Sequence, residues 1–118
     1  MVLTGACAAT SGATLHFKEW RPTPAECDAP NWCLVGAVRD RATDDPIVGA
    51  QVVVSGTQCA ALADSTGTFR RTCSGEPGDS LVVRGIGYTT MRRKVRIRPG
   101  HGYRAVIRLS RVPSRPVF

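Results

Sequence analysis

The segment Asp64-Ser65-Thr66-Gly67 contains the residue types that surround the reactive carboxyl group of aspartic proteases. That chemistry needs two carboxyl groups that share one proton. The segment occurs once in the chain, and it has one residue more than the protease pattern. Asp and Gly are also the residues that a tight turn between two strands requires. The segment therefore predicts a turn and no catalytic site.

The two histidines, His16 and His101, are the candidates for a general acid or base near neutral pH. No serine, cysteine and carboxylate stand at a spacing that completes a catalytic triad with either of them. The prediction is a non-enzymatic protein, and loss of an activity in His16→Ala or His101→Ala would overturn it. Gly85-Ile86-Gly87 precedes no predicted helix that could bind phosphate, so it predicts a bend in a strand.

Five cysteines in a small chain are typical of an oxidising compartment. Cys59 and Cys73 flank the Asp64–Gly67 turn almost symmetrically, which predicts a cross-strand disulfide. Cys27 and Cys33 enclose a short loop and form the second predicted pair. Reduced core cysteines in a cytosolic protein are the open alternative. No Cys-x-x-Cys or paired His and Cys spacing typical of zinc is present, and no metal ion or other cofactor is predicted.

Cys7 has no predicted partner, and two explanations of it stay open. The residues Leu3-Thr4-Gly5-Ala6-Cys7 are similar to the end of a lipoprotein signal, although the leucine is one place too far from the cysteine. In that case the true start lies upstream and Cys7 is a lipid anchor. In the other case residues 1–13 are an ordinary tail of small residues. No stretch of about 18 apolar residues occurs, so no transmembrane segment of the chain's own is predicted.

The net charge of +7 is divided unevenly along the chain. Residues 1–83 carry six basic and nine acidic side chains, whereas residues 84–118 carry ten basic side chains and no acidic one. This asymmetry indicates an acidic partner protein, an anionic lipid surface or a solvated strand face. Nucleic acid is disfavoured, because aromatic residues do not alternate with the arginines and the cysteines indicate a different compartment.

Short apolar segments, each followed by turn residues, run from Leu34 to the end of the chain. Their spacing of roughly ten residues and their period-two alternation are typical of an antiparallel β-sandwich. Leu15 and Phe17, which alternate with polar residues, predict a further short edge strand. The predicted strands of the sandwich are residues 34–39, 50–55, 58–63, 68–73, 80–85, 88–98 and 103–111.

The last two predicted strands form a hairpin around Pro99-Gly100-His101-Gly102. Alternation places their basic residues together on one outer face. Neighbouring like charges repel each other, and an acidic partner would remove that cost. The predicted partner-binding residues are these arginines and the apolar residues near both ends of the chain: Arg96, Arg98, Arg104, Arg108, Phe17, Trp20, Val117 and Phe118.

Three blocks of residues, in order, resemble the carboxypeptidase regulatory-like domain, a transthyretin-like β-sandwich family. The matching residues are Gly36, Val38, Asp40, Thr43, Pro46, Ile47, Gly49, Ala50, Val52, Val54 and Gly56, then Asp64, Gly67 and Phe69, then Pro77, Gly78, Asp79, Leu81, Val83, Gly87 and Tyr88. The resemblance covers about residues 34–112 and implies an all-β fold, a single seven-stranded antiparallel Ig-like or transthyretin-like β-sandwich. Residues 1–33 would be an extended N-terminal segment and residues 113–118 a C-terminal tail.

The family resemblance also implies a non-catalytic accessory module. Together with the basic hairpin it predicts an accessory or structural subunit in the bacterial periplasm or at the cell surface. Such a subunit would dock onto other protein subunits of an envelope or membrane complex through the hairpin and both tails. The alternative is a secreted glycan- or peptide-binding module that uses Trp20, Trp32 and the loops at the sandwich ends.

Overall fold

A computed structural model describes residues 12–22, Cys27 and residues 30–113 of the 118-residue chain. This part of the chain folds into eight strands and contains no helix. The strands are β1 (Thr14–Trp20), β2 (Trp32–Asp40), β3 (Gln51–Val54), β4 (Ala60–Leu62), β5 (Thr68–Cys73), β6 (Ser80–Arg84), β7 (Met91–Lys94) and β8 (Gly102–Leu109).

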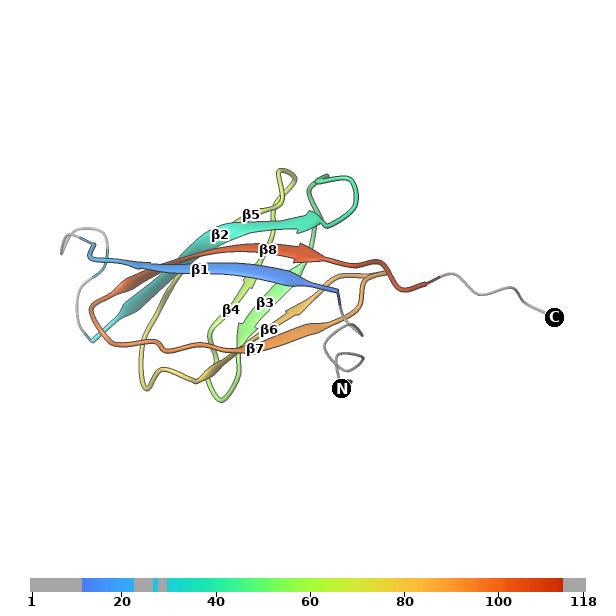
Figure 1. Cartoon of the computed structure of the whole chain (residues 1–118). Helices are drawn as coiled ribbons and strands as arrows, with labels where there is room; N and C mark the ends of the chain where they lie inside the picture. Colours follow the sequence, from blue (N-terminus) through green and yellow to red (C-terminus); the bar gives the residue numbers. More distant parts are fainter. Residues whose placement is uncertain (1–11, 23–26, 28–29, 114–118) are drawn as a thin grey trace.

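The strands form two four-stranded sheets that pack as a sandwich (Figure 1). The first, which we call sheet A, has the strand order β1-β8-β2-β5, and the second, sheet B, has the order β4-β3-β6-β7. The predicted all-β sandwich is thereby confirmed. Neighbouring strands are antiparallel with one exception, because β2 and β8 run parallel over Cys33–Asp40 and Gly102–Leu109.

β1 is the further edge strand that Leu15 and Phe17 predict, and it pairs with β8 along its whole length from Thr14 to Trp20 at the edge of sheet A. One detail differs from the predicted antiparallel sandwich. β8 enters sheet A after crossing over from sheet B and lies between β1 and β2, in the direction of β2. Alternation assigns a strand to a face but carries no information about its direction, so the parallel pair was not predictable from the pattern.

The predicted basic hairpin does not form. β7 pairs with β6 in sheet B, whereas β8 pairs with β1 and β2 in sheet A, and residues 95–101 connect the two sheets. The predicted strand 88–98 is reduced to Met91–Lys94. Beyond it the backbone makes individual contacts instead of a ladder: Val95 N–H donates to the Asp79 carbonyl and Arg98 N–H donates to the Tyr103 hydroxyl.

Alternating residues from both sheets fill the core. Val38 and Ile107 of sheet A, and Leu81 and Val83 of sheet B, are completely shielded from solvent. Sheet A leaves no room for a side chain at Gly36, since a Cβ there would overlap the backbone oxygen of Ala105 on the neighbouring strand β8. This close approach of β2 and β8 explains the physical need for glycine at that position of the first block.

Two disulfides join Cys59 to Cys73 and Cys27 to Cys33, with Cα atoms 5.6 and 6.1 Å apart. Cys59 precedes β4 of sheet B, and Cys73 ends β5 of sheet A. The first disulfide therefore joins the two sheets at their β4 and β5 edges and does not cross a β-ladder. The residues between β4 and β5 form a turn that passes from one sheet to the other.

Candidate functional site

Asp40 and Tyr88, from the first and third blocks, meet in the interior. The Tyr88 hydroxyl donates to Asp40 Oδ2 at 2.7 Å, and Arg111 Nε donates to the same oxygen at 2.8 Å. Asp40 Oδ1 accepts from the backbone N–H groups of Ala42 and Thr43. These bonds, the one from Tyr88 foremost, lower the pKa of Asp40 to about 2. Asp40 is 1% exposed, and both of its carboxylate oxygens accept hydrogen bonds. It therefore holds the end of β2 to Tyr88 and Arg111, and neither oxygen is available as a catalytic base.

Asp64 is engaged by its own turn, in agreement with the prediction that this segment is a turn. Its Oδ1 accepts from the Thr66 hydroxyl at 2.7 Å and from the backbone N–H groups of Thr66 and Thr68. The Thr66 hydroxyl is the largest cause of the fall in the pKa of Asp64 to about 2. The Gly67 N–H closes the turn on the Asp64 carbonyl at 2.9 Å.

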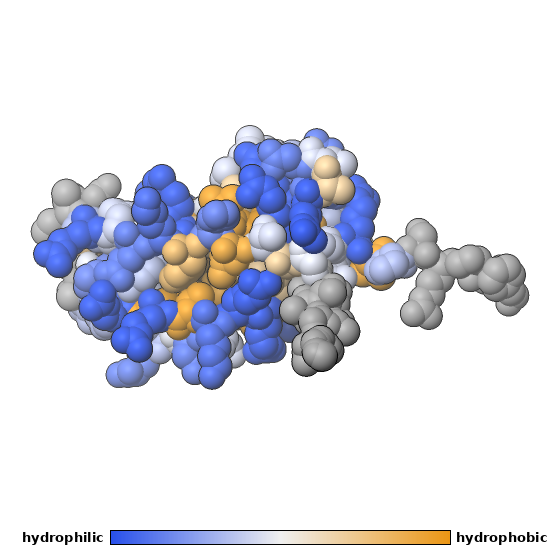
Figure 2. All heavy atoms as spheres, viewed as in Figure 1, coloured by the Kyte–Doolittle hydropathy of each residue, from blue (hydrophilic) through white to orange (hydrophobic). Residues whose placement is uncertain are grey.

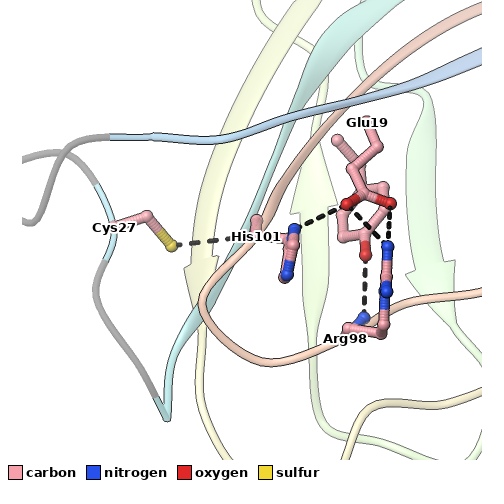
Figure 3. Close-up of polar contacts among 5 residues, drawn as sticks. Glu19, Cys27, Arg98 and His101 are labelled. Carbon is pink, nitrogen blue, oxygen red and sulfur yellow. Dashed lines mark hydrogen bonds and ion pairs between the residues drawn. The ribbon is translucent and has the colours of Figure 1, made fainter.

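Glu19, Arg98 and His101 form a polar cluster at one end of the sandwich (Figure 3). Arg98 donates to both carboxylate oxygens of Glu19 at 3.0 and 2.9 Å, and His101 Nδ1 lies 2.5 Å from Glu19 Oε2. Arg98 first, and then His101, lower the pKa of Glu19. The nearby sulfur of Cys27 is bonded to Cys33, so it offers no nucleophile to this pair. The cluster fastens β1 to the segment that precedes β8.

Most of the predicted partner-binding residues that the structure describes have contacts within the chain. Arg98 pairs with Glu19, and Arg108 pairs with Asp44 at 3.2 Å. Arg96 and Arg104 are exposed and have no ion pair among the described residues, but Arg96 follows β7 of sheet B and Arg104 lies on β8 of sheet A. The four arginines therefore do not share the single face that the predicted hairpin would have given them.

The aromatic candidates also pack within the chain. Phe17 is partly buried and stacks on Tyr103, with ring centroids 5.2 Å apart. Trp20 lies against Gly102, where a Cβ would meet its indole ring. Trp32 is fully buried and its Nε1 donates to the Gly75 carbonyl at 3.3 Å, so it cannot form an exposed sugar platform with Trp20. Cys7, Val117 and Phe118 lie outside the described residues, and the contacts assigned to them stay predictions.

The view in Figure 2 shows apolar surface in the middle of the molecule, around the position of β1, bordered by hydrophilic residues. Leu15, Phe17 and Val95 are partly buried and pack against the core cluster. Their contacts with the core account for the apolar character of these positions without an external partner.

A row of basic residues crosses the outer face of sheet A. The strand register places Lys18 opposite Arg104, Arg104 opposite Val35, and Val35 opposite Arg70, on β1, β8, β2 and β5. The three basic side chains are exposed, and none of them pairs with a carboxylate of the described residues.

These residues line a groove of ≈ 470 Å³, with Trp20 at one end, that continues into a second hollow of ≈ 570 Å³. The two hollows share Val35, Arg70 and Arg104, and Val106 lines the second. We call this surface the basic groove and define it by Lys18, Trp20, Val35, Arg70, Arg104 and Val106. Two carboxylates, Glu19 and Asp64, also line the hollows, but Glu19 pairs with Arg98 and His101, and Asp64 accepts hydrogen bonds from its own turn. Sequence reasoning found Arg104 and Trp20 but missed Lys18 and Arg70, which belong to the part of the chain with a net negative charge.

Residues 12–22, 27 and 30–113 contain neither a candidate metal site nor a helix that could span a membrane. No three His, Cys, Asp or Glu side chains gather there in a way that could hold a metal ion. The same residues form no helix that is long and apolar enough to cross a membrane.

Residues 34–112 match the CarboxypepD_reg-like domain, and the chain belongs to this family. Domains of this kind are generally non-catalytic. Within the chain, 53 residues are 43% identical to the TonB-dependent receptor SusC of Bacteroides thetaiotaomicron. The matched segment is 45% of this chain but only 5% of the receptor. The disulfides and the similarity to SusC together point to an extracytoplasmic location.

Proposed function

We propose that this chain is a non-catalytic docking module that serves an outer-membrane receptor system of the SusC kind. It works in the periplasm or at the cell surface, and its partners are protein subunits of that envelope assembly. The observation that carries the proposal is a contrast between two sets of charged residues. The motif carboxylates Asp40 and Asp64 are held by hydrogen bonds within the chain, whereas the basic side chains across sheet A have no partner among the described residues.

The engaged carboxylates support the non-catalytic part of the proposal. A general base needs a carboxylate or imidazole within reach of a substrate. Asp40 is buried under Tyr88 and Arg111, and Asp64 is held by its own turn. Glu19 and His101 face each other, and Arg98 holds the same carboxylate. Each of these groups has a role in holding strands or turns together.

The similarity to SusC supports the receptor part of the proposal. A segment that is 43% identical to part of a TonB-dependent receptor is expected to fold as that part does and to occupy an equivalent place. Of the arginines predicted to bind a partner, Arg104 has the setting that a docking site requires. It is exposed, it belongs to a row of three like charges, and it borders a groove.

A hybrid receptor tests this function. The region of SusC that contains the matched segment is replaced by residues 12–113, which include all eight strands, and TonB-dependent uptake of the receptor's ligand is measured in cells. The hybrid is expected to reach the outer membrane and to retain most of the uptake. The matched control carries Gly36→Ala, which disrupts the contact between β2 and β8 and is expected to lose uptake. A hybrid that is well folded and correctly located but takes up no ligand would show that this domain does not serve such a receptor.

A further inference from the structure

We propose that the basic groove binds an extended acidic peptide segment that carries a large apolar side chain and belongs to a partner protein. This inference rests on the proposed docking function, and it assigns that function a surface and a ligand chemistry. The surface is the outer face of sheet A, from Trp20 and Lys18 on β1 to Arg70 on β5.

Electrostatic repulsion within the row gives the first argument. Lys18 and Arg104 are directly opposite each other on adjacent antiparallel strands, where side chains start about 5 Å apart. Arg70 follows on the far side of Val35, about 10 Å from Arg104 for a strand spacing of about 4.8 Å. Like charges in these positions destabilise the free sheet. Carboxylates placed over the row would remove that cost, which favours an anionic ligand.

The width of the row gives the second argument. Three strand spacings separate β1 from β5, so the row is about 14 Å wide. A single phosphate or carboxylate is too small to reach all three basic side chains. An extended peptide of four or five residues covers this width at about 3.3 Å per residue. Its alternate side chains lie on one face about 7 Å apart, which suits acidic residues above a row of separated positive charges.

The apolar residues of the groove give the third argument and separate a peptide from a membrane surface. Val35 lies between Arg104 and Arg70 in the row, Val106 lies in the next row, and both are half-buried. Trp20 lies at the end of the groove against Gly102. A recessed apolar floor between basic walls can receive the side chain of a Phe or Leu residue. A flat layer of lipid headgroups would contact the walls and leave the floor uncovered.

The test uses the 118-residue chain and the peptide acetyl-Glu-Glu-Phe-Glu-Leu-Glu-Glu-amide, with binding followed by tryptophan fluorescence and by amide NMR shifts. Trp20 lines the groove and Trp32 is fully buried, so the fluorescence change reports on Trp20. Arg104→Glu and Arg70→Glu are each expected to weaken binding about tenfold, because charge reversal replaces attraction with repulsion. The matched control Arg92→Glu makes the same charge change on β7 of sheet B, where Arg92 is exposed, and is expected to change affinity by less than about twofold.

Three further outcomes would overturn the inference. The first is no binding, or equal binding of the peptide in which every Glu is replaced by Gln. The second is an equal loss in Arg104→Glu and Arg92→Glu, which would show that net charge alone matters. The third is binding to phosphatidylserine vesicles, sensitive to Arg104→Glu, in the absence of peptide binding. If the hybrid receptor functions while the peptide does not bind, the docking function stands and the assignment of the groove fails.

Discussion

The disulfide between Cys59 and Cys73 makes a quantitative prediction about the stability of the sandwich. It joins sheet B, just before β4, to sheet A at the end of β5, and those two strands are not hydrogen-bonded to each other. The double variant Cys59→Ala/Cys73→Ala removes the link with little change in packing volume. Both cysteines are buried, so alanine is the suitable replacement.

The expected magnitude follows from the length of the closed loop. The two cysteines are 14 positions apart. Loop-closure entropy for a loop of about 15 residues corresponds to about 3 kcal/mol of stability. For a chain of this length, 1 kcal/mol shifts the Tm by about 4 °C. The variant is therefore expected to unfold about 12 °C below the wild-type chain.

The second disulfide provides an internal comparison. Cys27 and Cys33 are only 6 positions apart, so removing their link should cost about 2 kcal/mol. Thermal unfolding followed by circular dichroism, with and without a phosphine reductant, measures both effects. Reduction of the wild-type chain should lower its Tm by at least as much as the larger single effect. A Tm of Cys59→Ala/Cys73→Ala within about 2 °C of wild type, or no effect of the reductant, would refute this reasoning.

Three further predictions concern the residues that hold the fold together. Tyr88→Phe should raise the pKa of Asp40 from about 2 towards 3.8, because the hydrogen bond from the Tyr88 hydroxyl is the largest cause of the lowered pKa. NMR titration of the carboxyl groups measures this pKa, and an unchanged value would contradict the prediction. Asp40 and Asp64 have folded pKa values of about 2 against 3.8 when unfolded, so both stabilise the fold fully above pH 3.8 and lose this effect as the pH falls towards about 2. Urea unfolding across that range should show falling stability, and a flat profile would count against it. Gly36→Ala should lower the free energy of unfolding by more than about 3 kcal/mol, the upper range for overpacking, whereas Gly85→Ala should lower it much less. Equal free energies of unfolding for Gly36→Ala and the wild-type chain would disprove the close approach.

The all-β fold and the strand positions were predictable because local chemistry determines them. Period-two alternation predicted the short strands, and Asp64 and Gly67 predicted a turn. The two disulfide pairs were predictable from their position around a turn and a short loop. Each of these inferences uses residues that are near each other in the sequence.

The candidate site was less predictable because it depends on which strands become neighbours. Lys18, Arg104 and Arg70 are far apart in the sequence, and only the order β1-β8-β2-β5 brings them into one row. The basic hairpin was wrong for the same reason. Residues around Arg96 and Arg104 alternate as paired strands would, but Arg104 lies on β8 of sheet A, whereas Arg96 lies in the segment that connects sheet B to sheet A. The alternation of apolar and polar residues is the same whether two strands form a hairpin or lie in different sheets, so it cannot distinguish the two arrangements.

Site-specific photo-crosslinking in intact cells is the most direct measurement of whether this chain works by docking through sheet A. A photoreactive phenylalanine analogue is placed at Val106, which lines the basic groove, and at Arg92 on sheet B as the reference position. If sheet A is the docking face, position 106 gives one discrete adduct with an envelope protein, which disappears when Arg104→Glu is added, and position 92 gives none. Adducts of equal yield from both positions, or no adduct from position 106 in folded protein, would contradict it.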